Sequence, residues 1–286
     1  MRILITGGNG QLGIALVDAL AGREVTAFTH DALDVTEAAH VREVILEECP
    51  DVVVHCAAWT DTAGCERDPE RAMRENAEGA RNVAEAARAA GAAMVFVSTN
   101  EVFDGTTAPY AEDAKRTPLN AYGRSKAAGE DAVRETLSEH YIVRTSWLYG
   151  PGRVSFPEKI LEAAGKGSLR LVTDEIGSPT WTVDLAAAIS RLIETKEYGA
   201  YHLVNSGSCS RKEWAEEVLR LAGVDVPAEA VTQADFDLPY VKPVNSTLAN
   251  NRAAVLGITL RDWREALRDH LQATGRLAEQ AGSEAR

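Results

Sequence analysis

Tyr122 and Lys126 are the two side chains of this sequence whose types and spacing suggest catalysis. In a helix, positions four apart lie on one face, so the phenol and the ammonium would be neighbours. A free phenol has a pKa of about 10 and exchanges protons poorly at neutral pH. A neighbouring ammonium lowers that pKa, which would let Tyr122 exchange a proton with a carbonyl or hydroxyl oxygen. Such pairs are also common on solvated helices, so this pair alone does not establish a catalytic site.

A glycine-rich turn near the start of the chain suggests a second kind of site. An apolar run at 3–5 leads into a turn with Gly7, Gly10 and Gly13, and a helical pattern follows at 14–20. Glycines permit the tight turn and let a pyrophosphate approach the backbone at the helix N-terminus. The strand before and the helix after are the context that this motif requires. The spacing is G-x-x-G-x-x-G, which differs from the G-x-G-x-x-G of ordinary dehydrogenases.

Composition narrows the class of protein. The chain has 286 residues, 45% of them hydrophobic, a net charge of −13 and a pI near 5.0. It has no block of basic residues, so we expect no nucleic-acid partner. Its four cysteines fit no zinc or redox spacing, so we expect no metal site and reduced thiols. Without a signal-peptide pattern or an apolar run near ~20 residues, we expect a cytoplasmic protein with no membrane segment.

Elements that would position these residues alternate along the first half of the chain. Buried strands are predicted at 3–5, 25–28, 52–54, 94–97 and 141–143, and helices near 12–20, 37–48, 70–90 and 121–137. Such alternation predicts an α/β fold with a Rossmann-type, doubly wound parallel sheet, which binds ligands beyond the carboxyl ends of its strands.

The alternation weakens after residue 150, which predicts two domains. Residues 1–150 and 177–206 would form the dinucleotide-binding Rossmann domain, because a helix and a further strand in the second range return to the sheet. Residues 151–176 and 207–286 would form a smaller C-terminal α/β substrate-binding domain.

The T-G-G-x-G-x-x-G start and the later Y-x-x-x-K together resemble the extended short-chain dehydrogenase/reductase superfamily. More closely, the chain resembles the dTDP-4-dehydrorhamnose reductase family. Matching segments follow in family order at 98–105, 144–150, 177–180 and 242–246. The resemblance implies NAD(P)H-dependent reduction of a nucleotide-linked 4-keto-6-deoxysugar. The reaction expected is dTDP-4-dehydro-L-rhamnose to dTDP-L-rhamnose.

The resemblance also implies roles for single residues. Thr99, Tyr122 and Lys126 would be catalytic: Thr99 places the sugar carbonyl, Tyr122 gives its proton, and Lys126 holds the cofactor ribose. Trp147 would pack on the sugar, although a Trp is as often a core residue. Lys242 would face the diphosphate, where the family has Arg. The residues expected to bind substrate are Asn76, Thr99, Asn100, Glu101, Trp147 and Lys242.

NADPH is the cofactor expected, with NADH open. The second strand ends at Thr29, where an acid would bond the ribose 2′-hydroxyl of NAD, and a Thr tolerates a 2′-phosphate. Asp34 either borders the adenine with Val35 or caps the helix that begins near Thr36. The residues expected to bind cofactor are Gly7, Gly10, Gln11, Leu12, Gly13, Thr29, Asp34, Val35, Ala58, Trp59, Thr60, Tyr122 and Lys126.

Two residues depart from the family pattern and keep alternatives open. The reductases read S-T-D-Y-V-F, whereas this chain has Asn100 and Glu101 in place of Asp and Tyr. Nucleotide-sugar dehydratases read T-D-E, so Glu101 keeps a dehydratase or epimerase as the alternative enzyme. A non-catalytic regulatory subunit of this fold is the third reading, and the intact Thr99, Tyr122 and Lys126 argue against it. The partners expected are a dTDP-linked nucleotide sugar and, as an alternative to a monomer, a second copy in a homodimer.

Overall fold

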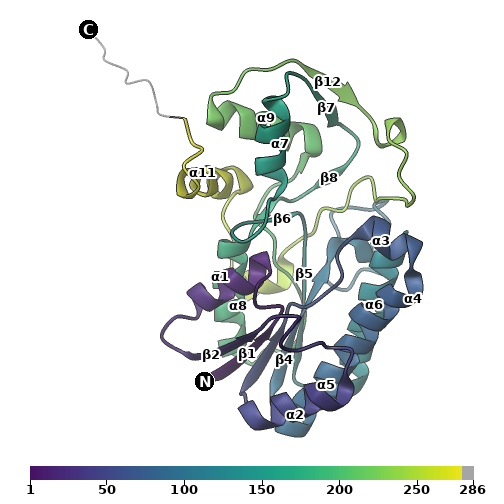
Figure 1. Ribbon diagram of the computed structural model, residues 1–286, viewed down its shortest axis with the longest axis vertical. Helices are drawn as coiled ribbons and strands as arrows, with labels where there is room; N and C mark the ends of the chain where they lie inside the picture. Colours follow the sequence, from purple (N-terminus) through teal and green to yellow (C-terminus); the bar gives the residue numbers. More distant parts are fainter. Residues whose placement is uncertain (279–286) are drawn as a thin grey trace.

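A six-stranded parallel sheet forms the centre of the computed structural model, which describes residues 1–278 (Figure 1). Its strand order is β10-β5-β4-β3-β1-β2, and every neighbouring pair runs parallel. The strands are β1 (Arg2–Thr6), β2 (Glu24–Phe28), β3 (Val52–His55), β4 (Ala93–Thr99), β5 (His140–Thr145) and β10 (Gly199–His202). The strand order reverses on the two sides of β1, which confirms the predicted doubly wound α/β fold.

Helices cover both faces of this sheet (Figure 1). On one face α1 (Gln11–Ala19) packs against α8 (Thr182–Thr195), and on the other α5 (Gly79–Ala90) lies between α2 (Ala38–Glu48) and α6 (Ala121–Thr136). Because both faces are covered, the central strands are almost continuously apolar and buried. Among residues 1–278, no helix combines the length and the apolar character needed to cross a bilayer.

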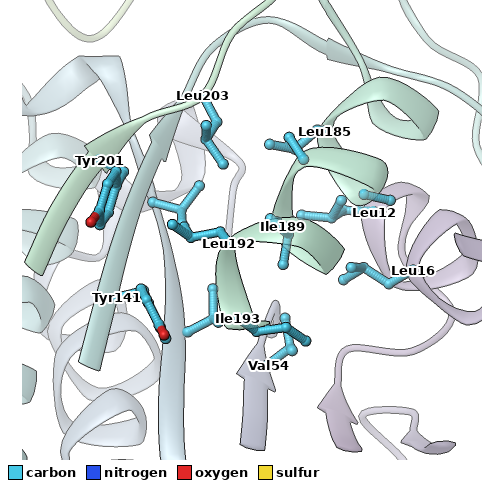
Figure 2. Packing of buried hydrophobic residues seen from close by; sticks show 14 of the residues in the cluster. Leu12, Leu16, Val54, Tyr141, Leu185, Ile189, Leu192, Ile193, Tyr201 and Leu203 are labelled. Atoms are coloured by element: carbon cyan, nitrogen blue, oxygen red, sulfur yellow. The ribbon is translucent and has the colours of Figure 1, made fainter. Parts of the chain in front are cut away.

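Figure 2 shows how one face of the sheet is filled. Leu185, Ile189 and Leu192 follow one another at helical spacing along α8 and are completely buried. They pack with Leu12 and Leu16 of α1 over the sheet. This apolar stripe fixes α1, and with it the turn that precedes α1, against the strands.

The helix predicted over 70–90 is not continuous. It consists of α4 (Pro69–Met73), a π-helical turn at Arg74–Glu78 and then α5. The wider turn directs Asn76 inward, where its side chain is fully buried. The sequence gives no periodicity signal for such a turn, because one extra residue in a long amphipathic pattern is too short to detect. π-turns of this kind often occur at functional sites.

A second core lies beyond the carboxyl ends of the sheet, where Trp214 and Trp263 are completely buried among apolar side chains. The elements that carry it include α7 (Phe156–Ala164), β7 (Leu169–Val172), α9 (Arg211–Ala222), β12 (Ala228–Val231) and α11 (Trp263–Ala273). The remaining short helices and strands of the chain, which are not confined to this core, are α3 (Thr62–Arg67), η2 (Asn100–Val102), β6 (Leu148–Tyr149), β8 (Ile176–Gly177), β9 (Thr180–Trp181), β11 (Cys209–Ser210), η3 (Gln233–Asp235) and α10 (Asn251–Val255). The division of the chain into two domains stays a prediction, and its last eight residues, 279–286, lie outside the described part.

Two glycines let α6 lie directly on neighbouring backbone. A Cβ at Gly123 would lie 2.2 Å from the carbonyl oxygen of Glu101, and a Cβ at Gly129 would lie 2.6 Å from that of Asn76. The helix begins after Asn120, whose side chain accepts a hydrogen bond from the Gly123 amide at 2.8 Å. The N-terminal turn of α6 is therefore held tightly against η2.

We expect Gly123→Ala to lower the free energy of unfolding by about 1–3 kcal/mol, because the added methyl group meets backbone that cannot move away. Gly165→Ala is the matched control, since Gly165 has an ordinary helical φ of −61° and a Cβ there would keep 3.4 Å from its nearest neighbour. Urea unfolding of both variants measures the difference. Equal stability of the two variants would contradict the close packing of α6.

Candidate active site

A cavity of about 570 Å³ lies at the carboxyl ends of the parallel strands and is called the first cavity below. It extends from the turn after β1 to α6, so it joins the glycine-rich turn to the pair Tyr122 and Lys126. Sixteen of the predicted site residues line it: Gly7, Gly10, Gln11, Leu12, Gly13, Asp34, Val35, Ala58, Trp59, Thr60, Thr99, Asn100, Glu101, Tyr122, Lys126 and Trp147.

The glycine-rich turn has no room for a side chain at two of its glycines. Gly7 has φ +69°, and a Cβ there would lie 2.8 Å from the amide nitrogen of Ala57. A Cβ at Gly13 would lie 2.4 Å from the carbonyl oxygen of Gly7. Gly10 is the N-cap of α1, and no side chain caps this helix end. The free amides of its first turn could therefore hold a pyrophosphate.

The end of β2 differs from the prediction. His30 lines the first cavity, whereas Thr29 is not among its described lining residues. Asp34 lines the cavity but does not cap α2, whose N-cap is Glu37. Its carboxylate instead accepts hydrogen bonds from the amide and the hydroxyl of Thr36 at 2.9 and 2.8 Å, and the amide bond lowers its pKa. The helix-cap interpretation of Asp34 was wrong because this local turn ends before α2 begins.

Asn76 was predicted to bind the substrate, but its buried side chain forms hydrogen bonds with neighbouring protein groups. Its Oδ1 accepts from the Trp59 amide at 2.8 Å, and its Nδ2 donates to the Trp59 carbonyl at 3.0 Å and to the Ser125 hydroxyl at 2.9 Å. The described lining of the first cavity does not include it. Asn76 therefore joins the strand-end loop that carries Trp59 to the helix that carries Tyr122.

Tyr122 has its proton at neutral pH. Burial raises the pKa of its phenol, the charge of Glu101 raises it further, and a contact with the Thr99 side chain opposes them. Lys126 was predicted to lower this pKa, but Lys126 is not among the groups that shift it. A phenol that keeps its proton can donate it to an oxygen that gains negative charge.

Lys126 is only 2% exposed. Its Nζ lies 4.1 Å from the centroid of the Phe96 ring, a cation–π contact. Burial lowers the pKa of Lys126 to about 8, although the charges of Glu130 and Cys56 oppose this shift. The ammonium and the phenol thus lie on one helix face, as predicted from their spacing, and both line the first cavity.

Glu130 lies one turn after Lys126 and connects α6 to the neighbouring strands. Its carboxylate is fully buried and accepts from the Arg144 guanidinium through two bonds of 2.8 Å and from the Ser98 hydroxyl at 2.7 Å. Arg116 and Arg134 form further ion pairs with the Glu130 carboxylate. Burial would raise the pKa of Glu130, but Arg144 brings it below its ordinary value.

The two residues that depart from the family pattern have different surroundings. Asn100 donates to the Ser246 hydroxyl at 2.5 Å and accepts from Thr99, so it links the end of β4 to the 242–246 segment. One oxygen of Glu101 accepts from the Asn120 side chain at 2.7 Å. Burial raises the pKa of Glu101, and nearby Glu175 adds to the effect. A buried carboxyl group with a raised pKa thus lies near the phenol of Tyr122.

Trp147 has φ +48°, a strained conformation for a Trp, at the end of β5. It stacks on Trp214 at 5.7 Å, and the guanidinium of Arg211 lies over its ring at 3.6 Å. It is therefore part of an aromatic cluster and also part of the cavity wall.

Lys242 does not line the first cavity but a second one of about 360 Å³, which shares Arg211 with the first. The described lining of this second cavity consists of Phe156, Lys159, Ile160, Arg170, Leu171, Val172, Glu175, Arg211 and Lys242.

Sequence reasoning missed several lining residues, among them His30, Arg71, Arg153 and Arg211. Arg71 stacks over Trp59 at 4.2 Å. Arg211 is the first residue of α9 and follows the N-cap Ser210, which forms a capping box with Glu213. No local pattern tells a solvated Arg at a helix start from one that reaches into a cavity.

Comparison with known proteins identifies the family. Residues 1–276 match the model of the RmlD substrate binding domain. A dTDP-4-dehydrorhamnose reductase from Streptomyces griseus is 41% identical, over 95% of this chain and 93% of the relative. A probable dTDP-4,6-dihydroxy-2-methyloxan-3-one 4-ketoreductase from Streptomyces antibioticus is 41% identical, over 94% of each chain. The crystal structure of dTDP-4-dehydrorhamnose reductase from Bacillus anthracis in complex with NADP superimposes with a TM-score of 0.93 at 36% identity, covering 95% of this chain and 99% of that one. The chain therefore belongs to the dTDP-4-dehydrorhamnose reductase family of sugar-nucleotide oxidoreductases.

Proposed function

We propose that this protein uses NADPH to reduce the 4-keto group of a dTDP-linked 4-keto-6-deoxysugar, with dTDP-4-dehydro-L-rhamnose as the substrate. The observation that carries the proposal is the continuous first cavity, which joins the glycine turn to Thr99, Tyr122 and Lys126. The NADP bound to the Bacillus anthracis relative supports the choice of cofactor.

The residues divide the work as follows. The glycine turn and the first amides of α1 hold the pyrophosphate, and Lys126 holds the nicotinamide ribose. NADPH supplies the hydride. Tyr122, whose phenol carries its proton before reaction, donates that proton to the oxygen of the sugar as negative charge develops there. Thr99, within reach of that phenol, orients the carbonyl.

The nucleotide half of the substrate fits the second cavity. Lys159, Arg170, Arg211 and Lys242 supply positive charge for a diphosphate. Arg211 lines both cavities and contacts Trp147, which lines the first cavity. With the diphosphate in the second cavity, the attached sugar would therefore extend past Arg211 into the first cavity, beside Trp147.

A nucleotide-sugar dehydratase is the second candidate, and the raised pKa of Glu101 favours it, since a protonated carboxyl could serve as an acid. Dehydration needs a second proton-transferring group, and the Asn100 amide has no titratable proton. Glu101 is then a hydrogen-bond partner for a sugar hydroxyl.

Tyr122→Phe should abolish turnover while NADPH still binds, because only the phenolic proton is lost. Loss of general acid catalysis lowers kcat by about 10²–10⁴-fold. Tyr198→Phe is the control, since this hydroxyl bonds Glu139 at the sheet edge. Steady-state kinetics and fluorescence titration of NADPH measure the two effects. Turnover of Tyr122→Phe at the wild-type rate would remove Tyr122 from the reaction.

NADPH should be used at least as well as NADH, because no acid at the end of β2 favours a free 2′-hydroxyl. The ratio of kcat/KM for the two cofactors measures this. His30→Asp should move the preference toward NADH more than Thr29→Asp does, since His30 lines the cavity and Thr29 does not. A preference of wild type for NADH by about tenfold or more would overturn the expectation.

NADPH absorbance should fall in step with formation of the 4-hydroxy sugar, because a reductase consumes one hydride for each ketosugar. Glu101→Gln should raise KM more than it lowers kcat, since its carboxylate accepts from the substrate and transfers no proton. Product analysis by mass spectrometry checks both. Loss of water from a glucose-linked nucleotide without consumption of NADPH would show a dehydratase instead.

A further inference from the structure

We propose that Glu175 competes with the substrate's diphosphate for Arg211 and Lys242. Binding of the nucleotide sugar would then displace this carboxylate, which would take up a proton from the solvent. The inference rests on the proposed function, which puts a nucleotide diphosphate in the second cavity.

The geometry of Glu175 resembles that of a bound phosphate group. Its Oε1 accepts from the Nε and a terminal nitrogen of Arg211 at 3.0 and 2.8 Å, and its Oε2 accepts from the Lys242 ammonium at 3.0 Å. A carboxylate held by the fork of an Arg uses the same donors that a phosphate would use. The two cations therefore cannot offer these donors fully to a diphosphate while Glu175 holds them.

The backbone keeps all three residues together. Glu175 lies between β7 and β8, and its carbonyl accepts from the Arg211 amide at 3.1 Å. The segment that follows Lys242 forms an isolated parallel bridge with β8, in which the Ile176 amide donates to the Val244 carbonyl at 2.7 Å. Arg211 is also fixed by its stacking on Trp147. Since the cations are anchored, the side chain of Glu175 is the group that must move.

Charge in the second cavity favours an anion. Four cationic side chains and one carboxylate, that of Glu175, are among its described lining residues. Lys159 comes from α7 and Arg170 from β7, and Arg170 also faces Glu229 at 3.6 Å. Glu175 thus offsets part of the positive charge that the diphosphate would meet.

Burial explains why a proton should accompany the exchange. Glu175 is 6% exposed, and burial alone would raise its pKa, but Arg211 and Lys242 bring it below its ordinary value. The other titratable groups near it are Glu101 from η2 and Tyr240 from the 232–242 segment. When a diphosphate takes the two cations, burial and the added negative charge both raise the pKa of Glu175. Binding should then take up a proton and weaken as pH rises through the interval between the low pKa and the raised one.

The test is calorimetric titration of the full-length protein with dTDP-glucose, which has no keto group to reduce. Both of its phosphates are esterified, so the ligand itself does not titrate near neutral pH. Titrations in buffers with different ionisation enthalpies count the protons. For wild type we expect proton uptake and an affinity that weakens as pH rises, by up to about tenfold per pH unit.

Glu175→Gln should bind dTDP-glucose roughly tenfold or more tightly, because a carboxylate beside a diphosphate is a like-charge pair. Its proton uptake should vanish and its affinity should no longer depend on pH. Glu229→Gln is the matched control, since it removes the same charge from an exposed residue that pairs with Arg170, another cation of this cavity. It should keep the proton uptake of wild type.

Weaker binding by Glu175→Gln would mean that the carboxylate positions the two cations, which overturns the inference and leaves the proposed function intact. Equal tightening in both variants would indicate a general charge effect and also overturn it. Absence of proton uptake in wild type would do so without any variant. Failure of wild type to bind dTDP-glucose at all would instead overturn the nucleotide assignment on which the inference rests.

Discussion

The buried ion cluster around Glu130 is the interaction on which the geometry of the site depends. A carboxylate with no exposure is stable only when it is paired and hydrogen-bonded, and Glu130 receives two bonds from Arg144 and one from Ser98. Ser98 precedes Thr99 at the end of β4, Arg144 lies near the end of β5, and Glu130 follows Lys126 by one turn. One side chain therefore fixes two strand ends relative to α6.

Close backbone contacts also hold α6 in place, in addition to the ion cluster around Glu130. Gly123 and Gly129 let α6 approach η2 and the π-turn, and Asn76 connects the π-turn to the loop after β3. The helix, the strand ends and the loop after β3 are thus connected into one wall of the first cavity. A wall of this kind can hold a proton donor within the tolerance that catalysis requires.

The two cavities meet at Arg211, which stacks on Trp147 and binds Glu175. The same guanidinium therefore borders both cavities and connects Trp147 to the region of positive charge. Burial also raises the pKa values of both Tyr122 and Glu101, which line the first cavity.

The sequence alone determined the features that depend on neighbours in the chain. Apolar runs located the strands, glycine spacing located the glycine-rich turn, and the four-residue step put Tyr122 and Lys126 on one face. Only the tertiary structure decided which polar side chains reach the cavities. Asn76 turned away through a π-turn, His30 took the place expected for Thr29, and Arg211 and Glu175 met across 36 residues. Such contacts join residues far apart in the chain, so local periodicity and spacing do not encode them.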